Sequence, residues 1–248
     1  MTVVLGTICE DGLVIAADRE VSGDGGVKFY EKKIFTFPTV NADIVLGYSG
    51  IPDVMRGLER DLRSRLEGQT KSSADIERDL RQALEKVIAK NDKSQFWTLC
   101  GFCEGGTYRL LKTYQRDVFP VPVWDCIGLA DNSSLIRYLA AIFLEPSVHL
   151  PLFRAVPICN YMVAQAKKYV GGCGGLTDLS IVRPNGKAQE QFSSVFTDNV
   201  CDMVEITINA ILTTTTEPDI TPERLETLIQ TLRDVLGNSL KAFPALLQ

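Results

Sequence analysis

The sequence is poor in histidine, since only one of its 248 residues, His149, carries an imidazole. A Ser-His-Asp triad or a histidine-based zinc site would have to use this residue. His149 follows Pro146-Ser147-Val148 between two expected helices, and nothing around it resembles a nucleophile elbow. We therefore interpret it as a surface histidine.

The seven cysteines lack the pattern of a disulfide framework, because their number is odd and they are scattered along the chain. Such spacing indicates free thiols in a reducing compartment. Cys100 and Cys103 have CxxC spacing, but they lie in an expected strand and no second pair follows. We interpret this pair as apolar packing, and Cys173, between two glycine pairs, as part of a close-packed turn.

The chain also lacks three other signals. No apolar run approaches the roughly 18 residues of a membrane span. No basic region followed by an apolar stretch marks a secretory signal at the N-terminus. The net charge of −5 argues against a nucleic-acid partner. We expect neither a membrane nor a nucleic-acid partner, and a cytoplasmic location.

Hydrophobic periodicity predicts alternating groups of strands and helices. The expected strands are 2–8, 13–18, 33–37, 43–48, 96–102, 108–114, 121–127 and 178–183. The expected helices are 52–67, 73–88, 131–144, 151–169, 196–212 and 222–240, with Ser73 as the cap of the second. This order predicts an α/β (α+β) fold, a four-layer αββα sandwich of two stacked, mainly antiparallel sheets flanked by helices.

Thr2 stands directly behind the initiator methionine and opens the first strand. A threonine at the chain terminus carries both a hydroxyl and a free α-amine. The amine can accept the hydroxyl proton, so the nucleophile brings its own base. A chain with a single histidine could hydrolyse an amide in this way.

Three segments, TVVLGTICEDGLVIAADREVSG, KKIF and ADIVLGYSGIPD, resemble a bacterial or archaeal proteasome β-type subunit of the N-terminal-nucleophile hydrolase family. The resemblance covers roughly the first quarter of the chain. It implies a catalytic group of Thr2, Asp18 and Lys33, with the Gly50 amide as the oxyanion donor. The charge of Lys33 would favour the neutral terminal amine, and Asp18 would hold the lysine. Lys32 is the alternative lysine.

The resemblance also places a substrate pocket at Val21, Glu31 and Tyr48. A carboxylate at Glu31 would favour a basic side chain before the cut. The later part of the chain departs from the family pattern. Leu129 or Ala130 stands where a supporting serine is expected, and Val170 and Cys173 stand where an aspartate and a serine are expected.

The sequence thus predicts a threonine-type endopeptidase that cleaves peptides or unfolded proteins through an acyl-enzyme, without a metal or organic cofactor. The active protein would begin at Thr2, since no propeptide separates Met1 from it. We expect one domain over 1–248, with a C-terminal helical extension at 196–248. The resemblance implies a ring-forming homo-oligomer and leaves an ATPase partner open. A non-catalytic subunit and an amidohydrolase of small amides are the alternatives.

Overall fold

The structure, a computed structural model, describes residues 2–22, 27–90, 96–128, 134–144 and 147–190, and positions 202, 205, 221, 223, 226 and 227. The chain divides into two compact units, Met1–Gln191 and Phe192–Gln248. The expected helices at 196–212 and 222–240 lie almost wholly outside the described residues. The single domain with an extension at 196–248 therefore stays a prediction.

Two sheets of five strands form the centre of the first unit within its described residues. The first sheet has the order β10-β1-β2-β11-β12, and the second has the order β5-β6-β7-β8-β9. The strands of the first sheet are β1 (Val3–Ile8), β2 (Leu13–Asp18), β10 (Trp124–Gly128), β11 (Thr177–Val182) and β12 (Ala188–Glu190). Those of the second are β5 (Ile34–Pro38), β6 (Asp43–Ser49), β7 (Trp97–Glu104), β8 (Thr107–Tyr114) and β9 (Asp117–Val121).

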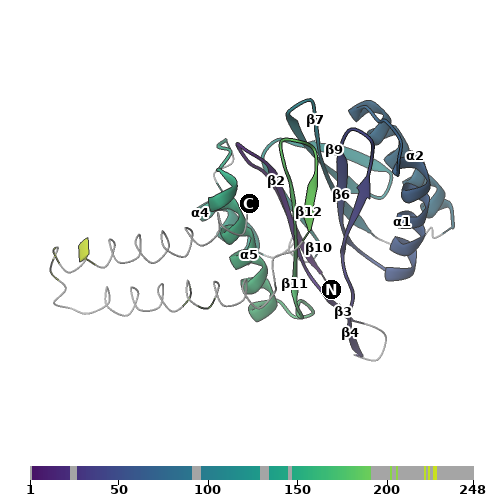
Figure 1. Ribbon diagram of the computed structural model, residues 1–248. Helices are drawn as coiled ribbons and strands as arrows, with labels where there is room; N and C mark the ends of the chain where they lie inside the picture. Colours follow the sequence, from purple (N-terminus) through teal and green to yellow (C-terminus); the bar gives the residue numbers. More distant parts are fainter. Residues whose placement is uncertain are drawn as a thin grey trace. The chain divides into compact units, whose positions relative to one another are not determined.

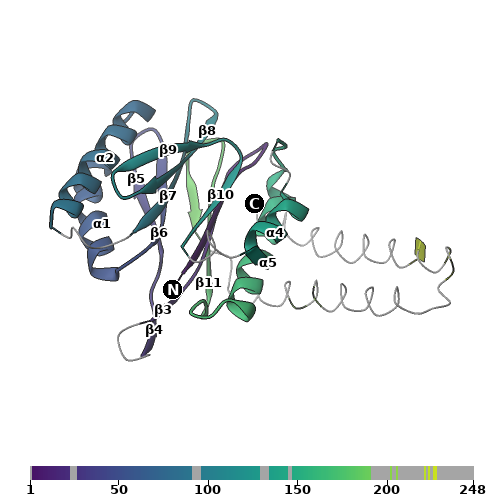
Figure 2. The same ribbon diagram turned by 180° about the vertical axis from the view of Figure 1, so that it is seen from behind.

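A short hairpin of β3 (Glu20–Ser22) and β4 (Lys28–Tyr30) stands beside the two sheets. Every described strand pair is antiparallel. The described helices are α1 (Pro52–Leu66), α2 (Ser73–Lys90), α4 (Ser134–Phe143) and α5 (Leu152–Tyr169). Figures 1 and 2 show α1 and α2 outside the second sheet and α4 and α5 outside the first. The predicted αββα sandwich is confirmed.

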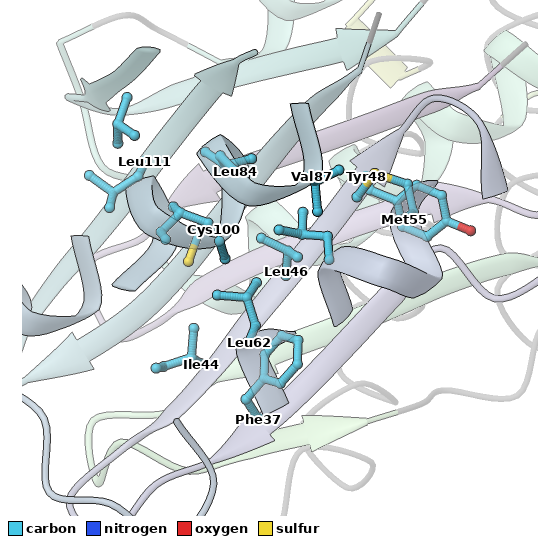
Figure 3. Close-up of a cluster of buried hydrophobic side chains, with 14 of the residues drawn as sticks. Phe37, Ile44, Leu46, Tyr48, Met55, Leu62, Leu84, Val87, Cys100 and Leu111 are labelled. Carbon is cyan, nitrogen blue, oxygen red and sulfur yellow. The ribbon is translucent and has the colours of Figure 1, made fainter. Parts of the chain in front are cut away.

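Two apolar clusters of the described residues hold the two sheets and helices α1 and α2 together. One lies between the sheets and joins Val4, Leu13 and Ile15 of the first to Val45 and Leu99 of the second. The other lies between the second sheet and helices α1 and α2. Figure 3 shows part of this second cluster, with Leu46 and Cys100 on strands and Leu62 and Leu84 on helices.

The burial of strand β2 accounts for the apolar run Leu13–Ala17 in the sequence. All six residues of β2 are buried, because α5 packs on one face of the strand and the second sheet on the other. A strand covered on both faces reads as a continuous apolar run rather than an alternating one. Helix α1, by contrast, shows a single buried stripe that includes Val54, Leu58 and Leu62.

The structure differs from the sequence-based prediction at several boundaries. The strand expected at 121–127 is divided between the last residue of β9 and most of β10. Pro122 lies at this break, where a residue without an N–H cannot continue a hydrogen-bonded ladder. The short strands β3, β4 and β12 were not predicted.

The cap of α2 is Ser72, not Ser73. The Ser72 hydroxyl accepts a hydrogen bond from the Asp75 N–H at 3.2 Å, and Asp75 Oδ2 accepts one from the Ser72 N–H at 3.2 Å. This reciprocal pair is a capping box, and Ser73 is the first residue of the helix.

Glycine at position 47 allows the two sheets to approach each other. A Cβ on Gly47 would lie 2.6 Å from Val4 Cγ1 and 3.0 Å from Ile15 Cγ2. We expect Gly47→Ala to destabilise the protein by about 1–3 kcal/mol, because overpacking forces the sheets apart. Urea unfolding measures this change.

The matched control is Gly57→Ala in α1, where an added Cβ meets no atom within 4 Å. This variant should gain about 0.5–1 kcal/mol from the better helix former. Equal effects of the two substitutions would contradict the close approach at Gly47.

Candidate active site

Several strand ends that carry the predicted site residues meet at one end of the sandwich. Antiparallel pairing places the start of β1 opposite the end of β10 and next to the end of β2, with Val3 facing Gly128 and Val4 facing Ala17. In the second sheet, Ile34 at the start of β5 pairs with Gly47 near the end of β6. Thr2, Asp18, Lys33 and Gly50 adjoin these ends and come from four different segments.

The Asp18 carboxylate joins these segments. Its Oδ1 accepts hydrogen bonds from the Val3 N–H at 2.9 Å and from Lys33 Nζ at 2.9 Å. Its Oδ2 accepts hydrogen bonds from the N–H groups of Glu20 at 3.1 Å and Gly174 at 3.0 Å. The side chain is fully buried, and these four donors compensate for its loss of water.

Lys33 is the lysine whose ammonium contacts Asp18. Its side chain is 1% exposed, and Nζ also donates to the Glu20 carbonyl oxygen at 2.5 Å. Burial lowers the pKa of Lys33 from its usual value, while the charge and the hydrogen bond of Asp18 and the charge of Glu20 oppose this shift. The structure therefore contains a dehydrated lysine that is held by a carboxylate.

The backbone around Lys33 is fixed as well. Its N–H donates to Asp178 Oδ2 at 3.4 Å, and its carbonyl oxygen accepts from the Tyr48 N–H at 3.1 Å. Asp178 Oδ1 also accepts a hydrogen bond from Arg19 Nε at 2.8 Å. Asp178 thus ties the segment after β2 to the segment before β5.

Thr2 is 6% exposed and lies against Gly128. Gly128 has φ of 87°, and a Cβ there would overlap with the Thr2 carbonyl oxygen and lie 2.8 Å from Ser49 Oγ. The close contact between Thr2 and the end of β10 therefore requires glycine at position 128. Gly128 was not among the site residues predicted from the sequence, although a glycine directly after an expected strand is a usable signal.

Gly50 follows β6 and has φ of 151°, which a residue with a side chain rarely adopts. The absence of a side chain leaves space for another backbone to approach. The predicted role of its amide as an oxyanion donor needs such an approach.

The turn after α5 takes part in the site through its backbone. The Gly174 carbonyl oxygen accepts hydrogen bonds from the N–H groups of Arg19 at 3.1 Å and Glu20 at 3.0 Å. Val170 is the C-cap of α5, and Cys173 is buried beside Asp18 and Lys33. Burial raises the pKa of the Cys173 thiol to about 12, which favours a packing role for this thiol. Leu129 and Ala130 lie outside the described residues.

The three predicted pocket residues have different environments. Val21 is buried, and the Tyr48 ring is buried and stacked on Phe35 with 5.3 Å between ring centroids. The Tyr48 hydroxyl is one of the buried polar atoms that have no hydrogen-bond partner among the described residues. Glu31 pairs with Arg56, with 2.7 Å between Oε1 and Nη1. The Glu31 charge is thus already matched by a cation of this chain.

The other candidates from the sequence lie outside this group. His149 is exposed, and its Nε2 is 3.3 Å from the Pro122 carbonyl oxygen. Cys100 and Cys103 belong to the two different apolar clusters, and so they lie on opposite faces of β7. Among the described residues, no three or more histidine, cysteine, aspartate or glutamate side chains are arranged to hold a metal ion. None of the described helices combines the length and the apolar character needed to cross a membrane.

Comparison with known proteins finds the same fold among solved structures, at low sequence identity. The sequence matches no protein-family model and no curated protein. Similar solved structures are Anbu proteins. Anbu from Yersinia bercovieri, described as an ancestral beta-subunit, is 14% identical with a TM-score of 0.73, over 89% of this chain and 99% of that one.

Two further Anbu structures are similar to the same degree. Anbu from Hyphomicrobium sp. strain MC1 is 14% identical with a TM-score of 0.72, over 88% of this chain and 100% of that one. A helical assembly of the Anbu complex from Pseudomonas aeruginosa is 13% identical with a TM-score of 0.72, over 89% of this chain and 99% of that one.

These similarities correct the family that the sequence suggested. The expected likeness was to a bacterial or archaeal proteasome β-type subunit, whereas the similar structures are Anbu proteins, which are proteasome-like but distinct. The motifs behind the expected likeness cover roughly the first quarter of the chain, whereas the structural similarity covers 88–89% of it. At such low identity the likeness shows the fold alone.

The contact between Thr2 and Gly128 can be tested by substitution. We expect Gly128→Ala to destabilise the protein by more than the roughly 1–2 kcal/mol of a left-handed alanine, because its Cβ would also displace Thr2. The amide NMR signal of Val3 should shift with it. Denaturant unfolding and the NMR spectrum measure the two effects.

Gly106→Ala is the matched control, since Gly106 has φ of 81° but open space within 4 Å of its Cβ. This variant should lose only the stability that a left-handed alanine costs, and its Val3 amide NMR signal should not shift. A Gly128→Ala variant as stable as this control, with an unchanged Val3 signal, would contradict the predicted contact.

Proposed function

We propose that this protein is an N-terminal threonine hydrolase that cleaves peptide bonds. The observation that supports this most directly is the bridge formed by Asp18. One carboxylate oxygen holds both the Lys33 ammonium and the N–H of Val3, which is the residue next to Thr2. This shared contact supports a role for Lys33 as a buried cation near the α-amine that Thr2 would carry once Met1 is removed.

The reaction begins with the Thr2 hydroxyl. Oγ1 attacks the carbonyl carbon of the peptide bond while the neutral α-amine accepts its proton. The Gly50 N–H and the Lys33 charge stabilise the oxyanion of the tetrahedral intermediate. Its collapse expels the amine product, which takes the proton, and leaves an acyl ester on Oγ1. Water, deprotonated by the same α-amine, then hydrolyses the ester and restores Thr2.

We propose that the side chain before the cut lies against Val21, Glu31 and Tyr48. The Tyr48 hydroxyl could serve as a hydrogen-bond donor to a bound group. Since Glu31 is paired with Arg56, a basic side chain would have to compete with Arg56 for the carboxylate. The preference for a basic side chain before the cut stays a prediction, and it requires that this side chain displace Arg56 from Glu31.

We propose that the protein acts as a homo-oligomer in the cytoplasm. A similar solved structure is a helical assembly of the Anbu complex, which supports self-association without defining a ring. Six described cysteines form no disulfide bond, as suits a reducing compartment. A peptide or unfolded protein is the proposed substrate, and an ATPase partner stays open.

A non-catalytic subunit with the same fold is the alternative. It is favoured by Val170 and Cys173, which stand where the sequence-based resemblance calls for an aspartate and a serine. An amidohydrolase of small amides would share the nucleophile and differ only in its pocket. Turnover of peptide and small-amide substrates by protein beginning at Thr2 separates these possibilities.

We predict that active protein begins at Thr2. An acylated nitrogen has no lone pair basic enough to accept the hydroxyl proton, so a retained Met1 would block the reaction. Intact-mass analysis should show the loss of one methionine, and a threonine-directed epoxyketone should add to the N-terminal peptide. Thr2→Val, which keeps the shape but lacks the hydroxyl, should form no adduct. Robust peptidase activity with Met1 retained throughout would show that Thr2 is not the nucleophile.

We also predict that Lys33→Ala lowers peptide hydrolysis by at least ~100-fold, from the usual effect of charge-stabilising groups. The same change should cost about 3–5 kcal/mol of stability, because it leaves the Asp18 charge buried without its cation. Rates are therefore measured well below the melting temperature.

Lys32→Ala is the control, since Lys32 is the adjacent lysine and the alternative from the sequence. It should retain most of the activity. Full activity in Lys33→Ala, or its loss in Lys32→Ala, would overturn the assignment.

A further inference from the structure

Glu20 supplies a second buried carboxylate beside Lys33, and the reaction described above does not use it. The residue opens β3 and is 3% exposed. Its N–H donates to Asp18 Oδ2, and its carbonyl oxygen accepts from Lys33 Nζ. The backbone of Glu20 is therefore part of the Asp18–Lys33 site.

The side chain of Glu20 remains close to that site. A Cβ on Gly174 would overlap with Glu20 Oε2, so the carboxylate lies directly against this glycine. Gly174 is also the residue whose N–H holds Asp18 Oδ2. Both carboxylates thus lie close to Gly174, and the charge of Glu20 acts on Lys33.

The cation that matches Glu20 is Lys28, on the facing strand β4. Lys28 Nζ lies 2.9 Å from Glu20 Oε1, with side-chain exposures of 58% for Lys28 and 4% for Glu20. Among the described residues, no donor meets hydrogen-bond geometry at Glu20 Oε1. The contact with Lys28 is therefore an ion pair that is stabilised by electrostatic attraction. It connects the solvent-exposed face of the hairpin to the buried site.

The charges around the site can be counted from the described groups. Asp18 and Glu20 are acidic, and Lys33 and Lys28 are basic; the Cys173 thiol lies beside them. Arg19 and Asp178 form a separate ion pair, and Asp178 also contacts the Lys33 backbone N–H. Loss of Lys28 would leave one negative charge uncompensated, and such a charge favours the protonated form of any nearby amine.

We propose that Glu20 and Lys28 form a charge-balanced pair that sets the protonation of the Thr2 amine beside Lys33, with Lys28 as its exposed half. Glu20 is then a positioning residue that acts through Lys33, since its carboxylate need not touch the substrate. This inference rests on the proposed function, because the amine must be neutral to act as the base. A modification that neutralises Lys28, such as acetylation, would lower activity at neutral pH.

The test compares Glu20→Gln, Lys28→Gln and the double variant in protein that begins at Thr2. The titration of the Thr2 α-amine is followed by NMR in ¹⁵N-threonine-labelled protein, and the acid limb of the kcat/KM profile is measured with a fluorogenic peptide. Lys28→Gln should move both midpoints up by about 0.5–1 pH unit, the effect of one charge over several ångströms in a protein. Glu20→Gln should move both down by a similar amount, and the double variant should return close to wild type.

Lys187→Gln is the matched control. Lys187 is 54% exposed and lies 3.2 Å from Asp43, in an ion pair at the start of β6 and away from Ser49 at its end. Its substitution should leave both midpoints unchanged.

Midpoint shifts of opposite sign in Glu20→Gln and Lys28→Gln distinguish a charge effect from a structural one. Lost packing would lower the melting temperature of both variants, but it would not shift their midpoints in opposite directions. Midpoints that stay fixed, or that move in the same direction in both single variants, would overturn the inference. A wild-type protein that begins at Thr2 and lacks peptidase activity would sink the proposed function, whereas the NMR titration would still decide whether the pair controls the amine.

Discussion

The buried carboxylate of Asp18 is the constraint on which the site depends. A charge without water must be matched by donors, and Asp18 receives them from Val3, Glu20, Lys33 and Gly174. These donors come from the first strand, the hairpin, the segment before β5 and the turn after α5. Removal of any one would leave a buried oxygen undersatisfied, so the four segments are held in one arrangement. The hydrolytic chemistry that we propose requires such a fixed arrangement, because a lysine and an amine must be held at a constant distance.

The spacing between the two sheets is the second constraint. Asp18 belongs to the first sheet, whereas Lys33 precedes a strand of the second, so they meet only if the sheets pack closely. Glycine at position 47 permits this approach where a Cβ would meet Val4. At the end of the sandwich, Gly128 lets Thr2 lie against β10, close to Ser49 of the other sheet. Small residues thus place polar groups from separate layers within hydrogen-bonding distance.

The likeness to Anbu structures concerns the fold, and a fold alone does not determine an activity. The proposed hydrolysis therefore depends on the site itself. It requires a free Thr2 amine, and the charges around that amine decide its protonation at neutral pH. In our proposal, the Glu20–Lys28 pair extends this control from the buried site to the surface of the hairpin.

The sequence by itself determined the layers of the fold, because apolar periodicity is a local property of the chain. The resemblance in short motifs singled out Asp18 and Lys33, and the structure joins their side chains by a hydrogen bond, while their catalytic role stays a proposal. The sequence did not determine which charges meet. Arg56 reaches Glu31 from a helix, and Gly128 meets Thr2 from a distant strand, so neither contact has a local signal. Cys100 and Cys103 resemble a pair in the sequence, yet the two faces of one strand separate them. Tertiary structure decided these points, since contacts between layers depend on sheet pairing and packing rather than on neighbours along the chain.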